Sequence, residues 1–194
     1  MSEKYAAILV DPPWRFEVYS DKGLGRNAEQ HYPTMAETSL RTLPIQDIMA
    51  KDCAVFMWVT WPTLPQALEL GAAWGLKYKT CAFLWAKSTR KVANRFSFLP
   101  LEENDNWHLG MGYWTRANTE PCLLFTQGSP KRKARDVRQL VVSMVRRHSQ
   151  KPDCIYGRVE SLVDGPYCEL FARQAYPGWA RWGNEIENTV ELTA

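Results

Sequence analysis

The stretch Ala6-Ala7-Ile8-Leu9-Val10-Asp11-Pro12-Pro13-Trp14 decides the fold of this chain. Its first five residues are small or branched and apolar, and an unbroken run of this kind predicts a strand that is buried on both faces. Pro12 and Pro13 end the strand, because proline cannot donate a hydrogen bond to a sheet and fixes φ at about −65°. The sequence therefore places a carboxylate, free carbonyl acceptors and an aromatic ring at the carboxyl end of a central strand, where ligands bind in open α/β sheets.

Asp11-Pro12-Pro13-Trp14 resembles the catalytic motif of S-adenosylmethionine-dependent amino methyltransferases, which methylate the exocyclic nitrogen of adenine or cytosine. Many DNA enzymes of this class have tyrosine or phenylalanine in the fourth place of the motif. With tryptophan there, this chain resembles the family of the 70-kilodalton messenger-RNA adenosine methyltransferase subunit and its bacterial and phage relatives. Taken alone, the four residues also fit a strand-ending turn with a buried tryptophan. The rest of the chain has to distinguish these two interpretations.

Further segments of the same family pattern follow in order along the chain. An aromatic-Pro-Thr-Met run (32–35) comes after the first loop, and Gly-x-Gly-Tyr-Trp-x-x-x-Asn-x-Glu (110–120) precedes a strand. Ser-Gln-Lys-Pro (149–152) resembles an element of permuted amino methyltransferases, and Trp-Ala-Arg-Trp-Gly-Asn (179–184) closes the set. The resemblance covers residues 5–185, and the ordered set is far more specific than any one of its motifs.

The spacing of apolar residues predicts alternating strands and helices. Residues 137–145 fit a short amphipathic helix and a strand equally well. Strand, helix and strand at the observed spacing form a βαβ unit, which implies parallel strands and right-handed crossovers. We expect an α/β, Rossmann-like methyltransferase fold, with a mostly parallel central sheet and helices on both faces. The expected strands are 53–59, 78–86, 121–126 and 167–171, and the expected helices are 37–49 (broken or shifted by Pro44), 64–74 and 152–163.

The order of the motifs has a consequence for the sheet. In the family that the chain resembles, a catalytic strand that comes first and a cofactor strand that comes last indicate a circularly permuted motif order. The strands at 6–10 and 167–171 should then lie side by side at the middle of the sheet, with a crevice at their carboxyl ends. The cofactor strand lacks the glycine-rich turn of most methyltransferases and continues into Phe171-Ala172-Arg173.

Length and composition predict one domain spanning residues 1–194, of which 45% are hydrophobic, and the resemblance implies that it is a methyltransferase domain. We expect substrate-side loops at 15–35 and 88–112 and a frayed tail at 186–194. No run of about 18 apolar residues and no signal-peptide pattern is present, which predicts a cytoplasmic protein without a membrane span. The five cysteines and three histidines show no metal-ligand spacing, so no metal site is expected.

The net charge of +3 is unevenly distributed. Residues 131–151 contain eight Lys or Arg and one acidic residue, a local net charge of +7. A run of charge is usually a solvated surface, but in a nucleotide-modifying enzyme it becomes a candidate phosphate contact with strong salt dependence. The candidates for this contact are Lys131, Arg132 and Lys133.

The chemistry of the expected reaction requires hydrogen-bond acceptors. The exocyclic amine of adenine is a poor nucleophile because its lone pair is delocalised into the ring. Acceptors for both N–H hydrogens let the nitrogen pyramidalise, and the Asp11 carboxylate and the Pro12 carbonyl, held rigid by Pro13, are the predicted pair. Trp14 is predicted to stack on the base, and a base inside a duplex must first be flipped out.

The resemblance implies roles for the remaining site residues, each of which has an ordinary alternative as a surface ion or a helix cap. Lys151 would pair with the methionyl carboxylate of the cofactor, beside Asp11, and Asn184 and Arg173 would bind the ribose hydroxyls. The other implied cofactor contacts are Glu169, Phe171 and Glu185. The implied substrate-side residues are Tyr32, Lys87, Asn118 and Glu120.

The predicted function is methyl transfer from S-adenosylmethionine to the exocyclic N6 of adenine in nucleic acid, by a monomer or homodimer. DNA is favoured over RNA by analogy with compact bacterial and phage modification enzymes. The alternatives are an RNA adenosine N6-methyltransferase and a non-catalytic nucleic-acid-binding or scaffold paralogue, and a weaker one is transfer to cytosine N4 or to a free small molecule. A silent paralogue is expected to have lost Asp-Pro-Pro-Trp, Lys151 and Asn184, which are all present here.

Overall fold

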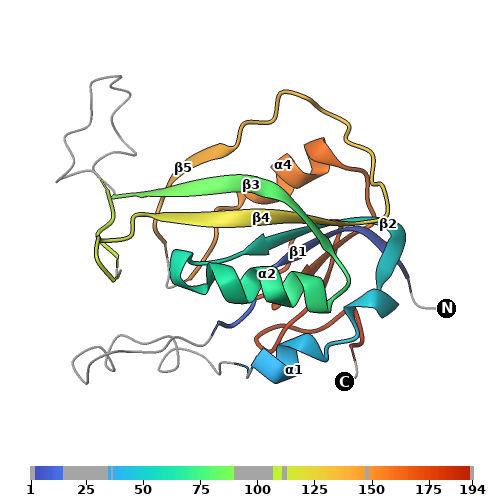
Figure 1. Ribbon diagram of the computed structural model, residues 1–194. Helices are drawn as coiled ribbons and strands as arrows, with labels where there is room; N and C mark the ends of the chain where they lie inside the picture. Colours follow the sequence, from blue (N-terminus) through green and yellow to red (C-terminus); the bar gives the residue numbers. More distant parts are fainter. Residues whose placement is uncertain are drawn as a thin grey trace.

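A computed structural model of the chain describes residues 3–14, 35, 37–89, 107–110, 113–146 and 149–192. The first strand, β1 (Tyr5–Val10), lies inside a seven-stranded sheet (Figure 1). Its side chains alternate between two hydrophobic cores, with Ile8 and Val10 in one and Ala7 and Leu9 in the other. All four are at most 3% exposed, which confirms the prediction of a strand buried on both faces.

Six more strands complete the sheet: β2 (Met49–Trp58), β3 (Lys77–Ser88), β4 (Thr119–Gln127), β5 (Leu140–Met144), β6 (Tyr167–Leu170) and β7 (Trp179–Trp182). Their order is β5-β3-β4-β2-β1-β6-β7. β4 runs antiparallel to both of its neighbours, and the other neighbouring pairs are parallel. The mostly parallel sheet is confirmed, with one correction: β2 and β3, the strands of the expected βαβ unit, are parallel but separated by β4.

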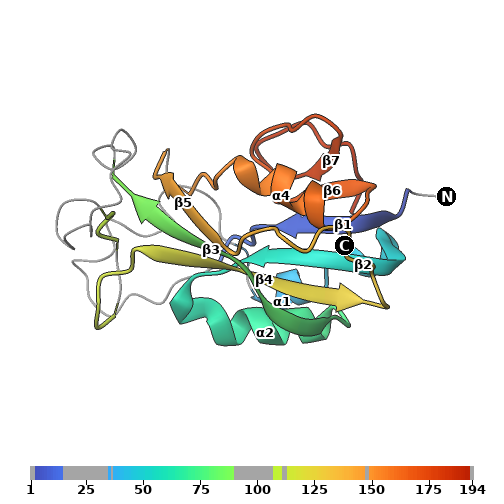
Figure 2. The same cartoon turned by 90° about the horizontal axis from the view of Figure 1, so that it is seen from above.

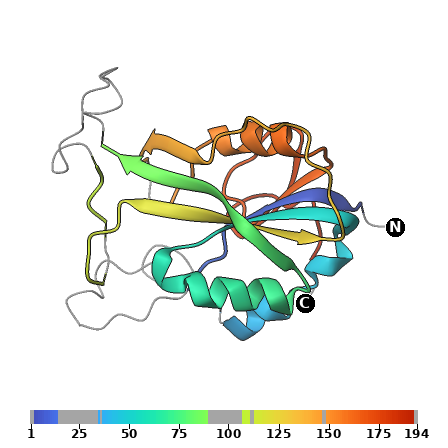
Figure 3. The ribbon, with the colours of Figure 1, turned by 45° about the horizontal axis from the view of Figure 1, so that its top comes forward.

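Helices cover both faces of the sheet (Figures 2 and 3). The short α1 (Glu37–Arg41) and α2 (Leu64–Ala73) lie on one face, and α4 (Cys154–Leu162) lies on the other. Side chains of α1 and α2 contribute to the first core and side chains of α4 to the second, so the prediction of helices on both faces of the sheet is confirmed. Within the described residues, no helix is long and apolar enough to span a membrane.

The helix predicted at 37–49 is shorter than expected. It ends at Arg41, and one 3₁₀ turn, η3 (Ile45–Asp47), follows Pro44 before β2 begins. The proline explains the break, because the residue before a proline is driven out of the helical region. The helices predicted at 64–74 and 152–163 correspond to α2, which a 3₁₀ turn η4 (Trp61–Thr63) precedes, and to α4.

The ambiguous segment at 137–145 contains the strand β5. Val141 is 1% exposed, whereas its neighbours Leu140 and Val142 are 54% and 50% exposed. This period of two is the burial pattern of a strand with one face on the core. β5 pairs with β3 and forms an edge of the sheet.

The first and the sixth strands lie side by side, as predicted. β1 and β6 are parallel and in register from Ala7 opposite Tyr167 to Val10 opposite Leu170. From β1 the chain continues to β2 on one side, whereas β6 and β7 lie on the other side. This reversal of strand order opens a crevice at the carboxyl ends of β1 and β6, where a ligand site is expected.

The C-terminal segment is ordered against the sheet, so the expectation of a frayed tail is wrong for its described part. Val190 is 7% exposed and belongs to the first core. The Thr189 N–H donates to the Arg181 carbonyl at 2.9 Å, and the Gly183 N–H donates to Asn188 Oδ1 at 2.7 Å. These bonds fold the chain back along β7, and the apolar Val190 then has a core to enter.

Candidate active site

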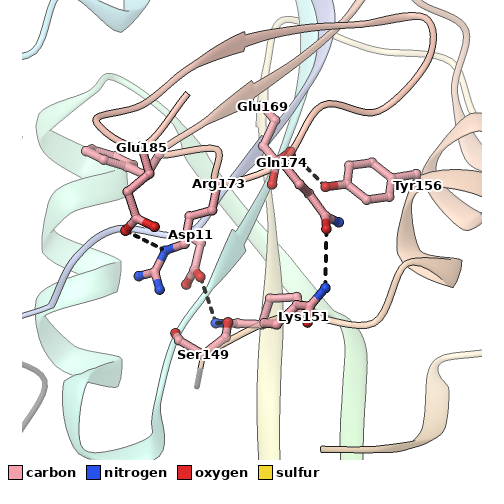
Figure 4. A pocket seen from close by; sticks show the side chains of 10 residues that line it. Asp11, Ser149, Lys151, Tyr156, Glu169, Arg173, Gln174 and Glu185 are labelled. Atoms are coloured by element: carbon pink, nitrogen blue, oxygen red, sulfur yellow. Dashed lines mark hydrogen bonds and ion pairs between the residues drawn. The ribbon is translucent and has the colours of Figure 1, made fainter. Parts of the chain in front are cut away.

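A cavity of about 330 Å³ opens where β1 and β6 end (Figure 4). Its volume falls in the range of small-molecule sites, about 300–1,000 Å³. Residues that are far apart in the sequence meet here, because the ends of β1 and β6 and the loop before α4 converge. The predicted residues that line it are Asp11, Lys151, Glu169, Phe171, Arg173 and Glu185, and the unpredicted ones are Ser149, Gln150, Tyr156 and Gln174.

Lys151 lies between two carboxylates. Its Nζ is 2.7 Å from Asp11 Oδ2 and 3.0 Å from Glu120 Oε1, and it donates a third hydrogen bond to the Ser149 carbonyl at 3.3 Å. An ammonium group has three donors, so all three have acceptors. The sequence predicted that Lys151 pairs with the methionyl carboxylate of a cofactor. Such a pairing requires Lys151 to give up one of these contacts.

The line of charge continues beyond Lys151. Lys87 Nζ is 2.6 Å from Glu120 Oε2, which gives the alternating order Lys87, Glu120, Lys151, Asp11. The exposed fractions of the four side chains are 22%, 9%, 13% and 19%. Charges that are this little solvated interact more strongly than surface ion pairs.

Burial and neighbouring charges together set the protonation of this line. Burial lowers the pKa of Lys151, but the Asp11 and Glu120 carboxylates outweigh it and hold the pKa above its ordinary value. Burial raises the pKa of Asp11. The Lys151 ammonium acts against this increase, and the Glu120 carboxylate adds to it. Burial also raises the pKa of Glu120, but Lys151 and Lys87 outweigh that effect and bring the pKa below its ordinary value. Asp11 is therefore the carboxylate of the two that is more easily protonated.

The Asp-Pro-Pro turn points the Asp11 side chain at the cavity. The Asp11 N–H donates to the Leu170 carbonyl at 3.5 Å, and the Trp14 N–H donates to the Pro12 carbonyl at 2.8 Å. A carbonyl oxygen has two lone pairs, so Pro12 keeps the capacity to accept a second hydrogen bond. The turn is therefore compatible with the prediction that Pro12 has a rigid backbone and a carbonyl that can accept a hydrogen bond from a ligand.

Trp14 does not offer an open ring face. The residue is 7% exposed, belongs to the first core and donates from Nε1 to the Trp58 carbonyl at 3.0 Å. The tight turn over Pro12 directs the ring back toward the end of β2, so the predicted stacking on a base does not agree with its position. The position of Trp14 instead agrees with the alternative interpretation of the motif, a strand-ending turn with a buried tryptophan.

Glu169 and Tyr156 form a second polar pair in the cavity. The Tyr156 hydroxyl donates to Glu169 Oε2 at 2.8 Å, across the space between α4 and β6 (Figure 4). Burial raises the pKa of Glu169 from 4.5 to about 7, against the opposing effect of the Tyr156 hydrogen bond. The carboxyl group of Glu169 therefore changes its charge near neutral pH.

We expect Glu169 to lower stability as pH rises. Between about pH 4.5 and pH 7 the folded state keeps a proton that the unfolded state has released, so the free energy of unfolding falls across this window, by about 3 kcal/mol in total. Glu169→Gln removes this titration and keeps an acceptor for Tyr156. Urea unfolding across the same pH range should show a flatter dependence for the variant, and equal slopes for both proteins would contradict the assignment.

The exits of β6 and β7 approach closely and shape the far wall of the cavity. Phe171 has a φ of 60°, a conformation that normally requires glycine, and its ring packs edge-on against Trp182 at 5.3 Å. A Cβ on Gly183 would lie 2.2 Å from the Ala172 carbonyl oxygen, so only glycine fits there. This approach brings Arg173 Nε within 3.7 Å of Glu185 Oε1 (Figure 4).

Several predicted residues are not brought to the cavity. Asn184 is exposed and does not line it, although its neighbour Glu185 does. Asn118 precedes the buried Glu120, and its backbone carbonyl accepts the Lys87 N–H at 2.8 Å. Tyr32, and most of the predicted loops at 15–35 and 88–112, lie outside the described residues.

The basic triplet Lys131, Arg132 and Lys133 lies at the end of the sheet where the parallel strands begin, whereas Asp11 lies at the end where they finish. The Lys133 N–H donates to the Leu162 carbonyl at the end of α4, and its Nζ is 2.7 Å from Asp164. Because β4 is antiparallel to β2, the segment after β4 emerges at the edge where the parallel strands begin. The structure thus separates these predicted substrate contacts from the cavity.

Comparison with known proteins identifies the class of site. A family model described as MT-A70 matches residues 5–185, which is the range marked by the ordered motifs. The chain belongs to the MT-A70 family. MT-A70 proteins are N6-adenine methyltransferases with a Rossmann-like fold, in agreement with the sheet and helices described above. The chain is therefore an enzyme of the adenine-N6 methyltransferase class.

Individual MT-A70 relatives come from bacteria and eukaryotes. The chain is 32% identical over 209 residues to the type II methyltransferase M.MunI of Mycoplasma sp., covering 98% of this chain and 82% of that protein. It is 28% identical over 189 residues to the human N(6)-adenosine-methyltransferase catalytic subunit METTL3 and over 191 residues to an MT-A70-like N(6)-adenosine-methyltransferase of Arabidopsis thaliana. These cover 95% and 97% of this chain but 28% and 24% of the relatives, so the chain spans about a quarter of their length.

The MT-A70 site contains residues that the sequence did not single out. Gln150 stands in the Ser-Gln-Lys-Pro motif without an expected role, and its Nε2 donates to Gln174 Oε1 at 3.3 Å. Tyr156 had a recognisable signal, since it lies on the apolar side of α4 beside Ile155, and a buried tyrosine hydroxyl needs a partner. The left-handed conformation of Ser149, with φ of 60°, had no signal in the sequence.

Proposed function

We propose that this protein transfers a methyl group from S-adenosylmethionine to the exocyclic N6 of adenine in DNA. The observation that carries the proposal is the Asp11 carboxylate, which lies in the wall of the cavity at the ends of β1 and β6, is held there by Lys151, and directly precedes the rigid Pro12-Pro13 unit. Membership of the MT-A70 family supports the reaction, and the extent of the similarity to M.MunI supports DNA as the polymer. A cytoplasmic location and a monomeric or homodimeric state stay predictions.

The residues of the cavity fit the cofactor. S-adenosylmethionine supplies an electrophilic sulfonium methyl group when bound. Glu169 and Glu185 offer acceptors for hydroxyl or amino groups, Arg173 and Gln150 offer donors, and Phe171 offers an apolar wall. The cavity also contains both signs of charge, as a zwitterionic and cationic ligand requires. We assign these residues to cofactor binding.

The chain's own residues activate and orient the amine. Asp11 and the second lone pair of the Pro12 carbonyl accept the two N–H hydrogens, which localises the nitrogen lone pair toward the cavity. Lys151 holds the Asp11 carboxylate in place through its 2.7 Å contact. The methylated amine is acidic and loses its proton after transfer, and Asp11, whose pKa burial raises, is the nearest acceptor in this arrangement.

The loop before β4 presents groups that suit nucleic acid. The described residues 113–118 lead into β4 at the end of the sheet where Asp11 lies, and the Ala117 carbonyl accepts a hydrogen bond from the Gly110 N–H at 3.0 Å. Trp114 is fully exposed and Tyr113 is 58% exposed, with the exposed Arg116 close by in sequence. Exposed aromatic rings next to a cation bind bases by stacking. We assign this loop to the DNA contact.

RNA is the second candidate substrate. The eukaryotic relatives are named as N(6)-adenosine-methyltransferases, and they match the chain over 95% or more of its length. Because the chain spans only about a quarter of these proteins, their activity is a weaker guide than that of M.MunI.

The deciding experiment is methyl transfer from labelled S-adenosylmethionine to matched DNA and RNA oligonucleotides, single- and double-stranded, with nucleoside analysis of the product. We expect N6-methyladenine in DNA. A triple variant, Lys131→Ala with Arg132→Ala and Lys133→Ala, is the surface control, and we expect it to retain transfer because these residues lie at the other edge. N6-methyladenine only in RNA would replace DNA by RNA, and N4-methylcytosine would contradict the assignment of the base.

A further inference from the structure

Lys87 and Glu120 lie behind the cavity rather than in its wall. Neither lines the cavity, yet Glu120 contacts Lys151, and Lys151 contacts Asp11. The two residues lie diagonally across neighbouring strands, because Glu120 of β4 is opposite Trp85 of β3, two residues before Lys87. The Lys87 N–H donates to the Asn118 carbonyl at 2.8 Å, and Nζ lies 4.9 Å from the centre of the Trp85 ring. Backbone pairing and a ring contact therefore fix the position of Lys87.

We propose that Lys87 is a positioning residue that acts through Glu120 and keeps Lys151 shared between Glu120 and Asp11. The inference rests on the proposed function for the role of Asp11. In this assignment Lys87 offsets part of the Glu120 charge, so that Glu120 does not draw Lys151 away from the end of β1. Lys87 was expected from sequence to bind substrate, and its 2.6 Å contact with Glu120 supports a structural partner instead.

Competition for one ammonium group is the physical basis of this role. Lys151 Nζ lies 2.7 Å from Asp11 Oδ2 and 3.0 Å from Glu120 Oε1, so the two contacts are nearly equal. The Glu120 side chain is 9% exposed and the Asp11 side chain is 19% exposed, so water does little to weaken either attraction. A change in the net charge at Glu120 must therefore change the hold of Lys151 on Asp11.

Other groups near Asp11 do not share this connection. Arg173 attracts the Asp11 carboxylate from the end of β6, and Glu169 and Cys122 also lie within electrostatic reach of it. Burial raises the pKa of the Cys122 thiol well above its ordinary value, so the thiol stays neutral. Of the contacts that the structure describes, only the line through Lys151 joins Asp11 to Glu120 and Lys87 by direct ion pairs.

The direct test is a ¹³C NMR titration of the Asp11 carboxyl in the cofactor-free protein, with Asp11→Asn to assign the resonance. Lys87→Met should move the Asp11 midpoint to higher pH, and Glu120→Gln should move it to lower pH, each by on the order of one pH unit. Lys87→Arg keeps the cation and should restore the wild-type midpoint. Lys87→Met and Glu120→Gln should shift the Asp11 midpoint in opposite directions. A loss of packing at Lys87 or Glu120 would not produce shifts of opposite sign. An unchanged midpoint in Lys87→Met would overturn the proposal.

The pH dependence of kcat gives a second readout that separates positioning from DNA contact. A shift of one pH unit lowers kcat about tenfold on the acidic side of the profile for Lys87→Met, with little change in KM for DNA. A phosphate contact would instead raise KM in a salt-dependent way and leave the Asp11 titration unchanged. The titration needs no turnover. Absence of methyl transfer would therefore contradict the proposed function, and an unmoved midpoint would contradict the role of Lys87.

Discussion

Asp11→Asn is expected to lower kcat for methyl transfer by about 10²–10³-fold without unfolding the protein. The substitution keeps the size of the side chain but removes the charge that accepts an N–H hydrogen of the amine and stabilises the developing positive nitrogen. Lys151 keeps its contacts with Glu120 and the Ser149 carbonyl, so no buried cation is left alone. Single-turnover transfer to DNA, with melting temperature and cofactor titration alongside, measures the effect.

Asp52→Asn is the matched control for this substitution. Asp52 Oδ1 accepts the Ser129 N–H at 2.7 Å at the edge of the sheet opposite Asp11. The control should show the wild-type rate. Full activity in Asp11→Asn would refute the assignment of Asp11 as the acceptor, whatever the other residues do.

Lys151→Met is expected to have the largest effect on stability, a loss of about 3–5 kcal/mol in the free energy of unfolding. It removes the Lys151 ion pair from Asp11 and leaves Glu120 with its Lys87 ion pair, and both carboxylate side chains are mostly buried. Transfer should be lost as well, because the Asp11 carboxylate is no longer held. Urea unfolding near pH 7 measures the loss.

Two comparisons test the cause of that loss. Adding Asp11→Asn to Lys151→Met removes one of the unpaired charges, so the double variant should be more stable than Lys151→Met alone. Lys133→Met removes an exposed ion pair with Asp164 and should change stability little. If all three variants were equally stable, the buried charge line would not contribute to folding.

The sequence predicted the fold through patterns that are local along the chain. The apolar run before Asp11 and the spacing in 64–74 correspond to β1 and α2, and the motif order correctly placed β1 beside β6. The position of β4 between β2 and β3 was not predictable in the same way, because an apolar strand pattern contains no information on strand direction or neighbour. The period-two burial of β5 became visible only once the sheet defined which face is buried.

The site was predicted in part. Six residues assigned from motifs line the cavity, since strand ends are close to one another in this kind of sheet. Two expectations do not agree with the described positions, for spatial reasons. Lys131–Lys133 are near Lys151 in the sequence, but Lys133 contacts the C-terminal end of α4 whereas Lys151 precedes its N-terminal end, so the length of α4 separates them in space. The Trp14 ring turns into the core, a direction that the residue type does not determine. The contact between Lys87 and Glu120 depends on β3–β4 pairing.

The left-handed Phe171 has a consequence for how such sites diversify. Most proteins place glycine in this conformation, and a glycine has no side chain with which to discriminate between ligands. Here a large ring occupies the turn at a backbone cost of about 1–3 kcal/mol and packs against Trp182. Substitution of the side chain at this position can therefore change ligand selectivity, which a glycine at the same position of the turn does not allow. A search based on glycine would overlook such chains, whereas one based on backbone conformation would find them.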